Sequence, residues 1–153
     1  MLIIGNGGHA KVVRDVLAEQ PISLGDDWSF IAVGNNSDRK KEALRNFPKR
    51  GFARLIHPSA VISPSTRIGP GTIVMAGCVI QADVEIGNHV IINTGATVDH
   101  DCRIGDFAHI APGVHLCGAV EVGEGALVGV GACAVPHAVI ASWSLVKAGT
   151  VAK

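Results

Sequence analysis

The sequence predicts a mainly β protein, with a parallel β-helix over residues 57–153 preceded by a small, truncated α/β region over residues 1–56. Three observations predict this fold. A bulky aliphatic residue returns at every sixth position from Ile56 to Val146, with Ala134 as the exception. Glycine follows that residue at intervals of eighteen, at Gly69, Gly87, Gly105 and Gly123. The first 56 residues lack this repeat and combine short apolar runs with helical spacing.

The period of six fits neither an α-helix nor a simple strand, whereas a stack of repeated units explains it. Three hexads make one coil, in which the aliphatic residue and a small residue four places later point inward. Each coil buries its apolar side against its neighbours at a spacing of roughly 4.8 Å. The turns between the strands take residues such as Gly, Asn and Asp. The repeat is long enough for about five coils.

The N-terminal region begins with an apolar strand, a glycine-rich turn and a helix. Residues 2–4 are apolar, residues 5–10 read GNGGHA, and residues 11–20 have helical spacing of valine and leucine. Free backbone N–H groups and the helix dipole at such a turn favour a phosphate group. A tight turn without a ligand is the alternative interpretation.

A dinucleotide-binding fold would place an acidic residue about 20 positions after the glycines, where Asp26 and Asp27 stand. The region is nevertheless too short for two full nucleotide-binding halves. The further elements expected here are a weak strand at 22–24, a strand at 29–33, a basic helix at 38–47 and a strand at 53–56. We therefore interpret residues 1–56 as a binding region for a small phosphorylated molecule, and the basic helix as a solvated face.

The composition does not favour nucleic-acid binding, membrane insertion or a cysteine-based zinc site. The net charge is zero, with 13 basic and 13 acidic residues, so the overall balance does not favour nucleic acid or an anionic membrane. The chain has no apolar run of eighteen residues and no signal-peptide pattern at its start, which predicts a cytoplasmic protein without membrane insertion. The four cysteines lack zinc-site spacing and are expected to be free thiols: Cys78, Cys102, Cys117 and Cys133.

Titratable residues gather at Asp99, His100 and Asp101, followed by His109 and His115. Counted from the inward Val98, His100 and Asp101 fall at an exposed corner of the β-helix. A histidine beside a carboxylate suits a general base, because the carboxylate can orient the ring and raise its basicity. The alternative is that both are ordinary corner residues.

His109 points outward from a flat face, nine residues and therefore half a coil from His100. The two histidines then lie on opposite sides of the β-helix and cannot meet within one chain. If both serve one site, that site lies between subunits of a cyclic assembly. His109 and His115 occupy equivalent places on successive faces and diverge, so a metal site is not favoured.

Four segments carry a resemblance to a known family: residues 5–13 (GNGGHAKVV), 31–36 with 39–41, 55–60 (LIHPSA) and 93–102 (NTGATVDHDC). With these motifs the chain resembles the left-handed β-helix acetyltransferases built from hexapeptide repeats. The resemblance is to the group of sialic acid O-acetyltransferases and UDP-4-amino-sugar N-acetyltransferases. It covers most of the chain and implies a homotrimer with its sites between subunits.

The resemblance implies that His100 is the general base for an amine attacking acetyl-CoA, with Asp101 orienting it. It implies that His109 contacts the cofactor and that the Gly118 N–H donates to the thioester oxygen. The residues implied to contact a UDP-linked 4-amino-4,6-dideoxy sugar are Gly7, Gly8, His9, Asp26, Asp27 and Asn93. No covalent acyl-enzyme and no metal is implied.

Two departures stand against the family pattern. The N-terminal region is short between its second and third strands, which affects the nucleotide contacts of Asp26 and Asp27. The chain stops at Lys153, where relatives usually continue into a G-x-P-A-K tail that helps to bind coenzyme A. The alternatives are a sugar O-acetyltransferase such as one acting on sialic acid, a non-catalytic trimeric nucleotide-sugar scaffold, and a metal-dependent hydratase.

Overall fold

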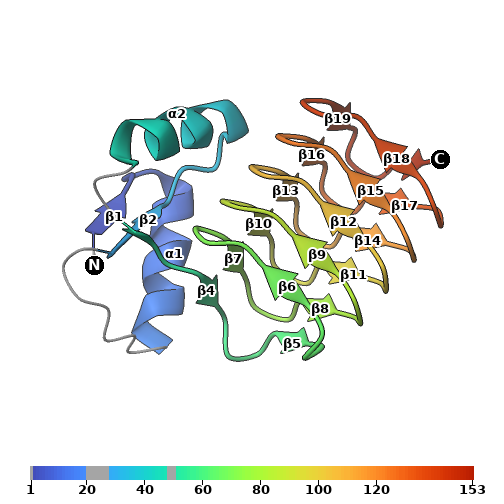
Figure 1. Ribbon diagram of the computed structural model, residues 1–153, viewed down its shortest axis with the longest axis horizontal. Helices are drawn as coiled ribbons and strands as arrows, with labels where there is room; N and C mark the ends of the chain where they lie inside the picture. Colours follow the sequence, from blue (N-terminus) through green and yellow to red (C-terminus); the bar gives the residue numbers. More distant parts are fainter. Residues whose placement is uncertain (1, 20–27, 48–50) are drawn as a thin grey trace.

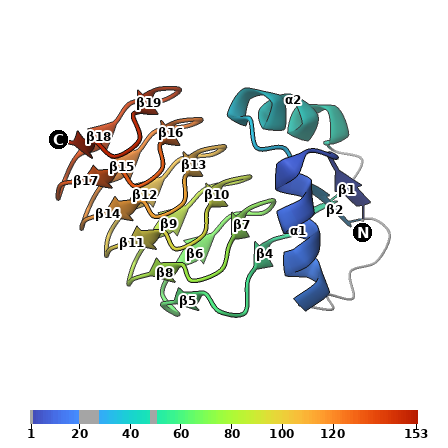
Figure 2. The ribbon, with the colours of Figure 1, turned by 180° about the vertical axis from the view of Figure 1, so that it is seen from behind.

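A computed structural model describes residues 2–19, 28–47 and 51–153. In these ranges the chain forms a parallel β-helix with a small α/β region packed along one side of it, as Figure 1 shows. The view from behind in Figure 2 shows the same arrangement, with the C-terminus at the far end of the stack. The predicted fold class is therefore confirmed.

The β-helix has three sheets, which we call faces 1, 2 and 3. Face 1 consists of β4 (Leu55–Ile56), β7 (Ile73–Val74), β10 (Ile91–Ile92), β13 (His109–Ile110), β16 (Leu127–Val128) and β19 (Leu145–Val146). Face 2 consists of β5 (Val61–Ile62), β8 (Val79–Ile80), β11 (Thr97–Val98), β14 (His115–Leu116), β17 (Cys133–Ala134) and β20 (Val151–Ala152). Face 3 consists of β6 (Arg67–Ile68), β9 (Glu85–Ile86), β12 (Arg103–Ile104), β15 (Glu121–Val122) and β18 (Val139–Ile140).

Strands of successive coils pair in parallel with partners eighteen residues apart, as in Ile91 with His109. The second residue of each strand points inward, and these aliphatic side chains with the small residues form one continuous core from Val74 to Ile140. Ala134 takes the inward place of β17 and is buried like its neighbours. Each buried Ile or Val stabilises the stack by roughly 1.5–3 kcal/mol, which is why the hexad pattern is so regular.

The corners between faces are tight turns, and from Gly71 onward the last residue of each turn has a positive φ angle. Glycine occupies many of these places because it adopts that conformation without strain. The remaining corners accept other residues, including Asp101 and Phe107, each with φ of 59°. We name each corner by the faces that it joins: corner 1–2 contains Thr94 and Gly95, corner 2–3 contains His100, Asp101 and Gly118, and corner 3–1 contains His89, Phe107 and Trp143.

The N-terminal region contains β1 (Leu2–Ile4), α1 (Gly8–Glu19), β2 (Trp28–Ile31), α2 (Asn36–Asn46) and β3 (Gly51–Phe52). The three strands form a parallel sheet in the order β1-β2-β3. The expected strand at 53–56 is wrong as one element, because β3 pairs with β2 whereas β4 already pairs with β7 of face 1. The boundary between residues 1–56 and 57–153 stays a prediction. The calls on Asp26, Asp27 and the strand at 22–24 lie outside the described residues.

Helix α1 covers the start of face 1. Its Val13 and Val16 pack with Leu55 and Ile73, which are the outward residues of β4 and β7. This contact explains why outward positions on face 1 are aliphatic in the first coils, where a solvent-facing strand would carry polar side chains. The α/β region is thereby attached to the β-helix through a second apolar core.

Candidate active site

His100 and Asp101 form an exposed pair at corner 2–3. The carboxylate Oδ2 of Asp101 lies 2.7 Å from Nδ1 of His100. The side chains of His100 and Asp101 are 60% and 62% exposed. The positive φ of Asp101 turns its side chain back toward the preceding residue. The backbone N–H of His100 donates to Asp99 Oδ1 at 2.8 Å, and this hydrogen bond stabilises the start of the turn. The pair leaves Nε2 of His100 free to meet a substrate.

The hydrogen bond to Asp101, followed by the negative charge of Asp99, raises the pKa of His100 above 6.5. A neutral imidazole in this setting is a stronger base than an isolated histidine. The geometry therefore fits a general base whose ring orientation is fixed by a carboxylate.

Gly118 lies one coil beyond His100 at the same corner. A Cβ built on Gly118 would lie 2.7 Å from Cε1 and 2.8 Å from Nε2 of His100. The φ angle of Gly118 is not in the left-handed region, so the backbone does not require glycine here. The glycine instead leaves room for the imidazole, and its N–H donates no hydrogen bond to any described group.

A second group of polar side chains lies where face 1 meets the α/β region. Asn93 Nδ2 lies 3.0 Å from Nε2 of His109, on the strand of the next coil. His9, in the first turn of α1, is near enough for its charge to act on His109. The sequence predicted that His109 points outward, but the N-terminal region largely covers it.

Both histidines of this second group are held neutral. Burial, followed by the positive charge of Arg39, lowers the pKa of His9 to about 4. Burial lowers the pKa of His109 to about 4 as well, with further contributions from Arg39 and His9, and a backbone hydrogen bond with Gly34 opposes the shift. At neutral pH these rings can accept or donate a hydrogen bond without carrying charge.

The glycine-rich turn is open around its two later glycines. Gly5 must be glycine, because its φ is 123° and an added Cβ would lie 2.6 Å from the Ala32 carbonyl oxygen. Gly7 and Gly8 have nothing within 4 Å of such a Cβ. A hollow of about 430 Å³, lined by Gly5 and Asn6 together with Ile4, Val33 and Glu42, opens after β1 and β2, the edge where α/β sheets usually hold ligands. Because α1 begins at Gly8, earlier than expected, His9 stands at the helix N-terminus.

The two groups do not meet within the chain. His109 lies on face 1, whereas His100 lies at corner 2–3, the corner opposite face 1 in a three-sided stack. Asn93 follows β10 beside corner 1–2, so it lies on the other edge of face 2 from His100. A site that used His100 together with Asn93 or His109 would need two copies of the chain.

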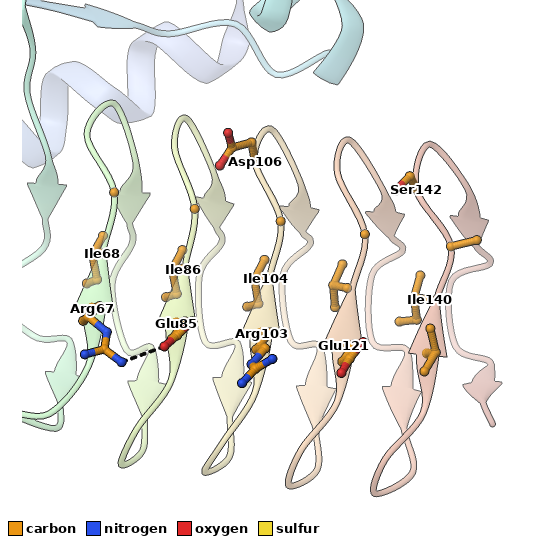
Figure 3. A pocket seen from close by; sticks show the side chains of 17 residues that line it. Arg67, Ile68, Glu85, Ile86, Arg103, Ile104, Asp106, Glu121, Ile140 and Ser142 are labelled. Atoms are coloured by element: carbon orange, nitrogen blue, oxygen red, sulfur yellow. Dashed lines mark hydrogen bonds and ion pairs between the residues drawn. The ribbon is translucent and has the colours of Figure 1, made fainter.

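A depression of about 690 Å³ lies on face 3 and is shown in Figure 3. Its outward side chains alternate in sign along the stack, from Arg67 through Glu85 and Arg103 to Glu121, and Arg67 bonds Glu85 at 2.7 Å. Four of its lining residues are glycines, at each of which an added Cβ would clash with atoms of the next coil: Gly69, Gly87, Gly105 and Gly123. It contains neither His100 nor His109, so we interpret it as a charge-paired outer surface.

The basic helix was expected to be a solvated face, and this is wrong for Arg39. Arg39 is 1% exposed and bonds backbone carbonyls of the β-helix, while Lys40 pairs with Glu124 and Asn36 donates to Gly125 O at 3.0 Å. The spacing of Asn36, Arg39 and Lys40, which puts the three side chains on one side of α2, was the available signal for docking. A charge count alone does not separate docking from solvation.

Within residues 2–19, 28–47 and 51–153, no three His, Cys, Asp or Glu side chains come close enough to hold a metal. No helix in those ranges is long and apolar enough to span a bilayer. The predicted cytoplasmic location stays a prediction.

All four cysteines are free thiols, and Cys78 and Cys102 are buried in the core as expected.

Comparison with known proteins fits this geometry. The family described as bacterial transferase hexapeptide (six repeats) matches residues 65–100. The crystal structure of PerB from Caulobacter crescentus, in complex with CoA and GDP-perosamine, is 40% identical with a TM-score of 0.93, over 99% of this chain and 87% of that one. The chain belongs to the hexapeptide-repeat acetyltransferases.

Two further members of the family are similar. The acetyltransferase domain of PglB from Neisseria gonorrhoeae is 34% identical with a TM-score of 0.94, over 99% of this chain and 90% of that one, and it has also been solved with acetyl coenzyme A. UDP-N-acetylbacillosamine N-acetyltransferase of Bacillus subtilis (strain 168) is 43% identical over 108 residues, which span 48% of this chain. That match spans half of the Bacillus enzyme's length, at 50%.

Proposed function

We propose that this protein transfers an acetyl group from acetyl-CoA to the amine of a nucleotide-linked amino sugar, with His100 as general base. The observation that carries the proposal is the exposed His100–Asp101 pair, whose ring lies against Gly118 and its free N–H. Relatives solved with CoA, acetyl coenzyme A and GDP-perosamine support the choice of donor and of acceptor class.

In the proposed reaction the sugar amine attacks the thioester carbonyl, a C–N bond forms, and the C–S bond breaks. His100 takes the proton that the amine loses, and the departing CoA thiolate is protonated in turn. The Gly118 N–H donates to the carbonyl oxygen as it becomes an oxyanion. No covalent acyl-enzyme is needed, because holding the two reactants together supplies much of the acceleration.

We further propose a homotrimer that packs through face 2. The outward side chains of face 2 include Val61 and Val151, which are 64% and 56% exposed, whereas face 3 presents alternating charges from Arg67 to Glu121 before it reaches Val139. If face 2 lies toward a threefold axis, its two edges meet the neighbouring copies. His100 at corner 2–3 of one copy would then approach Asn93, beside corner 1–2 of the next copy, and the His109 ring that lies against Asn93.

The acceptor is proposed to be a UDP-linked 4-amino-4,6-dideoxy sugar, held by Gly7, Gly8 and His9 with Asn93 near the reacting amine. The open space at Gly7 and Gly8 and the hollow at the sheet edge support a phosphate-bearing ligand there. A GDP-linked amino sugar is the second candidate, favoured by the similarity to PerB.

A thiol-release assay with acetyl-CoA tests the proposal against UDP-amino sugars, GDP-perosamine and sialic acid. We expect release only with a nucleotide-linked amino sugar, and its loss in His100→Ala by a factor on the order of 10²–10⁴. Release with sialic acid would replace the proposal by O-acetylation. A His100→Ala variant as active as the parent would exclude His100 as the base.

A further inference from the structure

Arg39 is a buried guanidinium that no carboxylate in the described ranges neutralises. Its Nε donates to His89 O at 2.8 Å, and its Nη2 donates to Phe107 O at 2.6 Å and to Ala108 O at 3.3 Å. These three acceptors belong to two successive coils of the β-helix, at corner 3–1 and immediately before β13. Burial lowers the pKa of Arg39 to about 10, so the group is charged at neutral pH.

The same guanidinium also bonds the N-terminal region. Nη1 donates to Val33 O at 3.1 Å and to Gly34 O at 3.0 Å, in the loop that follows β2. Nη2 donates to Asn36 Oδ1 at 3.0 Å. A planar fork with five N–H donors can join two backbone segments in this way, and a lysine ammonium with three donors cannot.

The two segments that Arg39 joins are those that carry the second polar group. Gly34 lies against His9, since a Cβ built on Gly34 would lie 3.6 Å from Cβ of His9. Gly34 also shares a backbone hydrogen bond with His109, and Ala108 immediately precedes His109. Arg39 therefore sits between the loop that supports His9 and the strand that presents His109.

We propose that Arg39 is a positioning residue that sets the distance between His9 of the N-terminal region and His109 of the β-helix. It touches no reacting atom in the proposed function, on which this inference rests. It fixes the width of the space in which the nucleotide-sugar and the thioester meet, and its loss would misplace both. Neighbouring Lys40, over the Phe107 and Trp143 rings at 5.8 and 5.2 Å, keeps α2 docked when Arg39 changes.

The test compares Arg39→Lys and Arg39→Met with Arg45→Lys. Arg45 is on the same helix and pairs with Glu42, and its side chain is 72% exposed. In the trimeric full chain we expect Arg39→Lys to keep a cooperative thermal transition while kcat falls about 10-fold or more, with KM for acetyl-CoA less affected. Arg45→Lys should retain the parent's kinetics.

A second readout does not need activity. Proton NMR of the histidine rings reports the surroundings of His9 and His109. We expect their signals to move in both Arg39 variants, and their titration midpoints to rise from about 4 in Arg39→Met, because the nearby charge is gone. Arg45→Lys should leave them in place.

An Arg39→Lys variant with the parent's kcat and unmoved histidine signals would overturn the proposal. So would a variant that does not fold, because Arg39 would then be needed for folding and not for positioning. If the parent acetylates none of the acceptors while the histidine signals move as expected, the proposed function fails and the positioning role of Arg39 stands.

Discussion

The imidazole of His100 lies against Gly118, one coil further along the same corner, at a place where a Cβ would lie 2.7 Å from Cε1 and force the ring to move. Two repeat positions that are equivalent in the hexad therefore have different tasks: one presents the base, and the next leaves space for it. In the proposed reaction the Gly118 N–H, which makes no hydrogen bond within the described residues, donates to the thioester oxygen.

Replacing Gly118 with alanine tests that relationship. The backbone tolerates alanine, because the Gly118 φ is not left-handed, but the new Cβ would approach His100 Nε2 to 2.8 Å. We expect an unchanged melting temperature and a kcat lower by about 10-fold or more, since the base is displaced. Wild-type turnover in Gly118→Ala would show that the position of this ring does not matter.

The pH dependence should follow His100. Because its neutral form is the base, kcat/KM should rise with pH through the His100 pKa, which Asp101 and Asp99 raise above 6.5. In Asp101→Asn that pKa falls, so the acidic limb moves to lower pH, and kcat drops about 10-fold because the ring loses its orienting carboxylate. A pH–rate profile of both proteins measures this, and an acidic limb that does not move would contradict it.

Stability should fall as the solution is acidified. Burial lowers the pKa of His9, His89 and His109 from 6.5 to about 4, so the unfolded chain binds more protons than the folded one between these values. The stabilisation is complete above pH 6.5 and is lost as the pH falls toward 4.

His89→Phe isolates one of these three groups. The ring of His89 stacks on Phe107 at 5.2 Å, and Phe107 itself occupies the equivalent corner position, so phenylalanine fits the site. We expect the urea midpoints at pH 7 and pH 4.5 to differ less in His89→Phe than in the parent. An equal difference in the two proteins would show that His89 is not one of the groups responsible.

The proposed assembly predicts which surface valine matters. Val61→Glu puts a charge on face 2 and should shift the protein from trimer to monomer and abolish activity. Val139→Glu is the matched control, because Val139 is equally exposed, at 68%, but points outward from face 3. Sedimentation measurements on the two variants decide this, and a trimeric Val61→Glu protein would exclude face 2 as the interface.

The sequence predicted the β-helix well because the hexad pattern reflects a single local rule, an aliphatic residue inward in every strand. It also placed His100 and Asp101 at an exposed corner, since position within the coil fixes direction. It could not predict that α2 docks through Arg39, because burial of a guanidinium depends on backbone carbonyls brought together from distant coils. For the same reason the sequence predicted that His109 points outward from its strand, but not that the N-terminal region buries the side chain.

Mixing of subunits tests most directly the central claim that His100 and the Asn93–His109 group form one site across two copies. His100→Ala and Asn93→Ala should each be nearly inactive alone. Coexpressed with different tags and purified as mixed trimers, they should regain about one third of the parent's activity, because one of the three interfaces in every mixed trimer pairs an intact His100 with an intact Asn93. Mixed trimers as inactive as the two variants would show that the site does not lie between subunits.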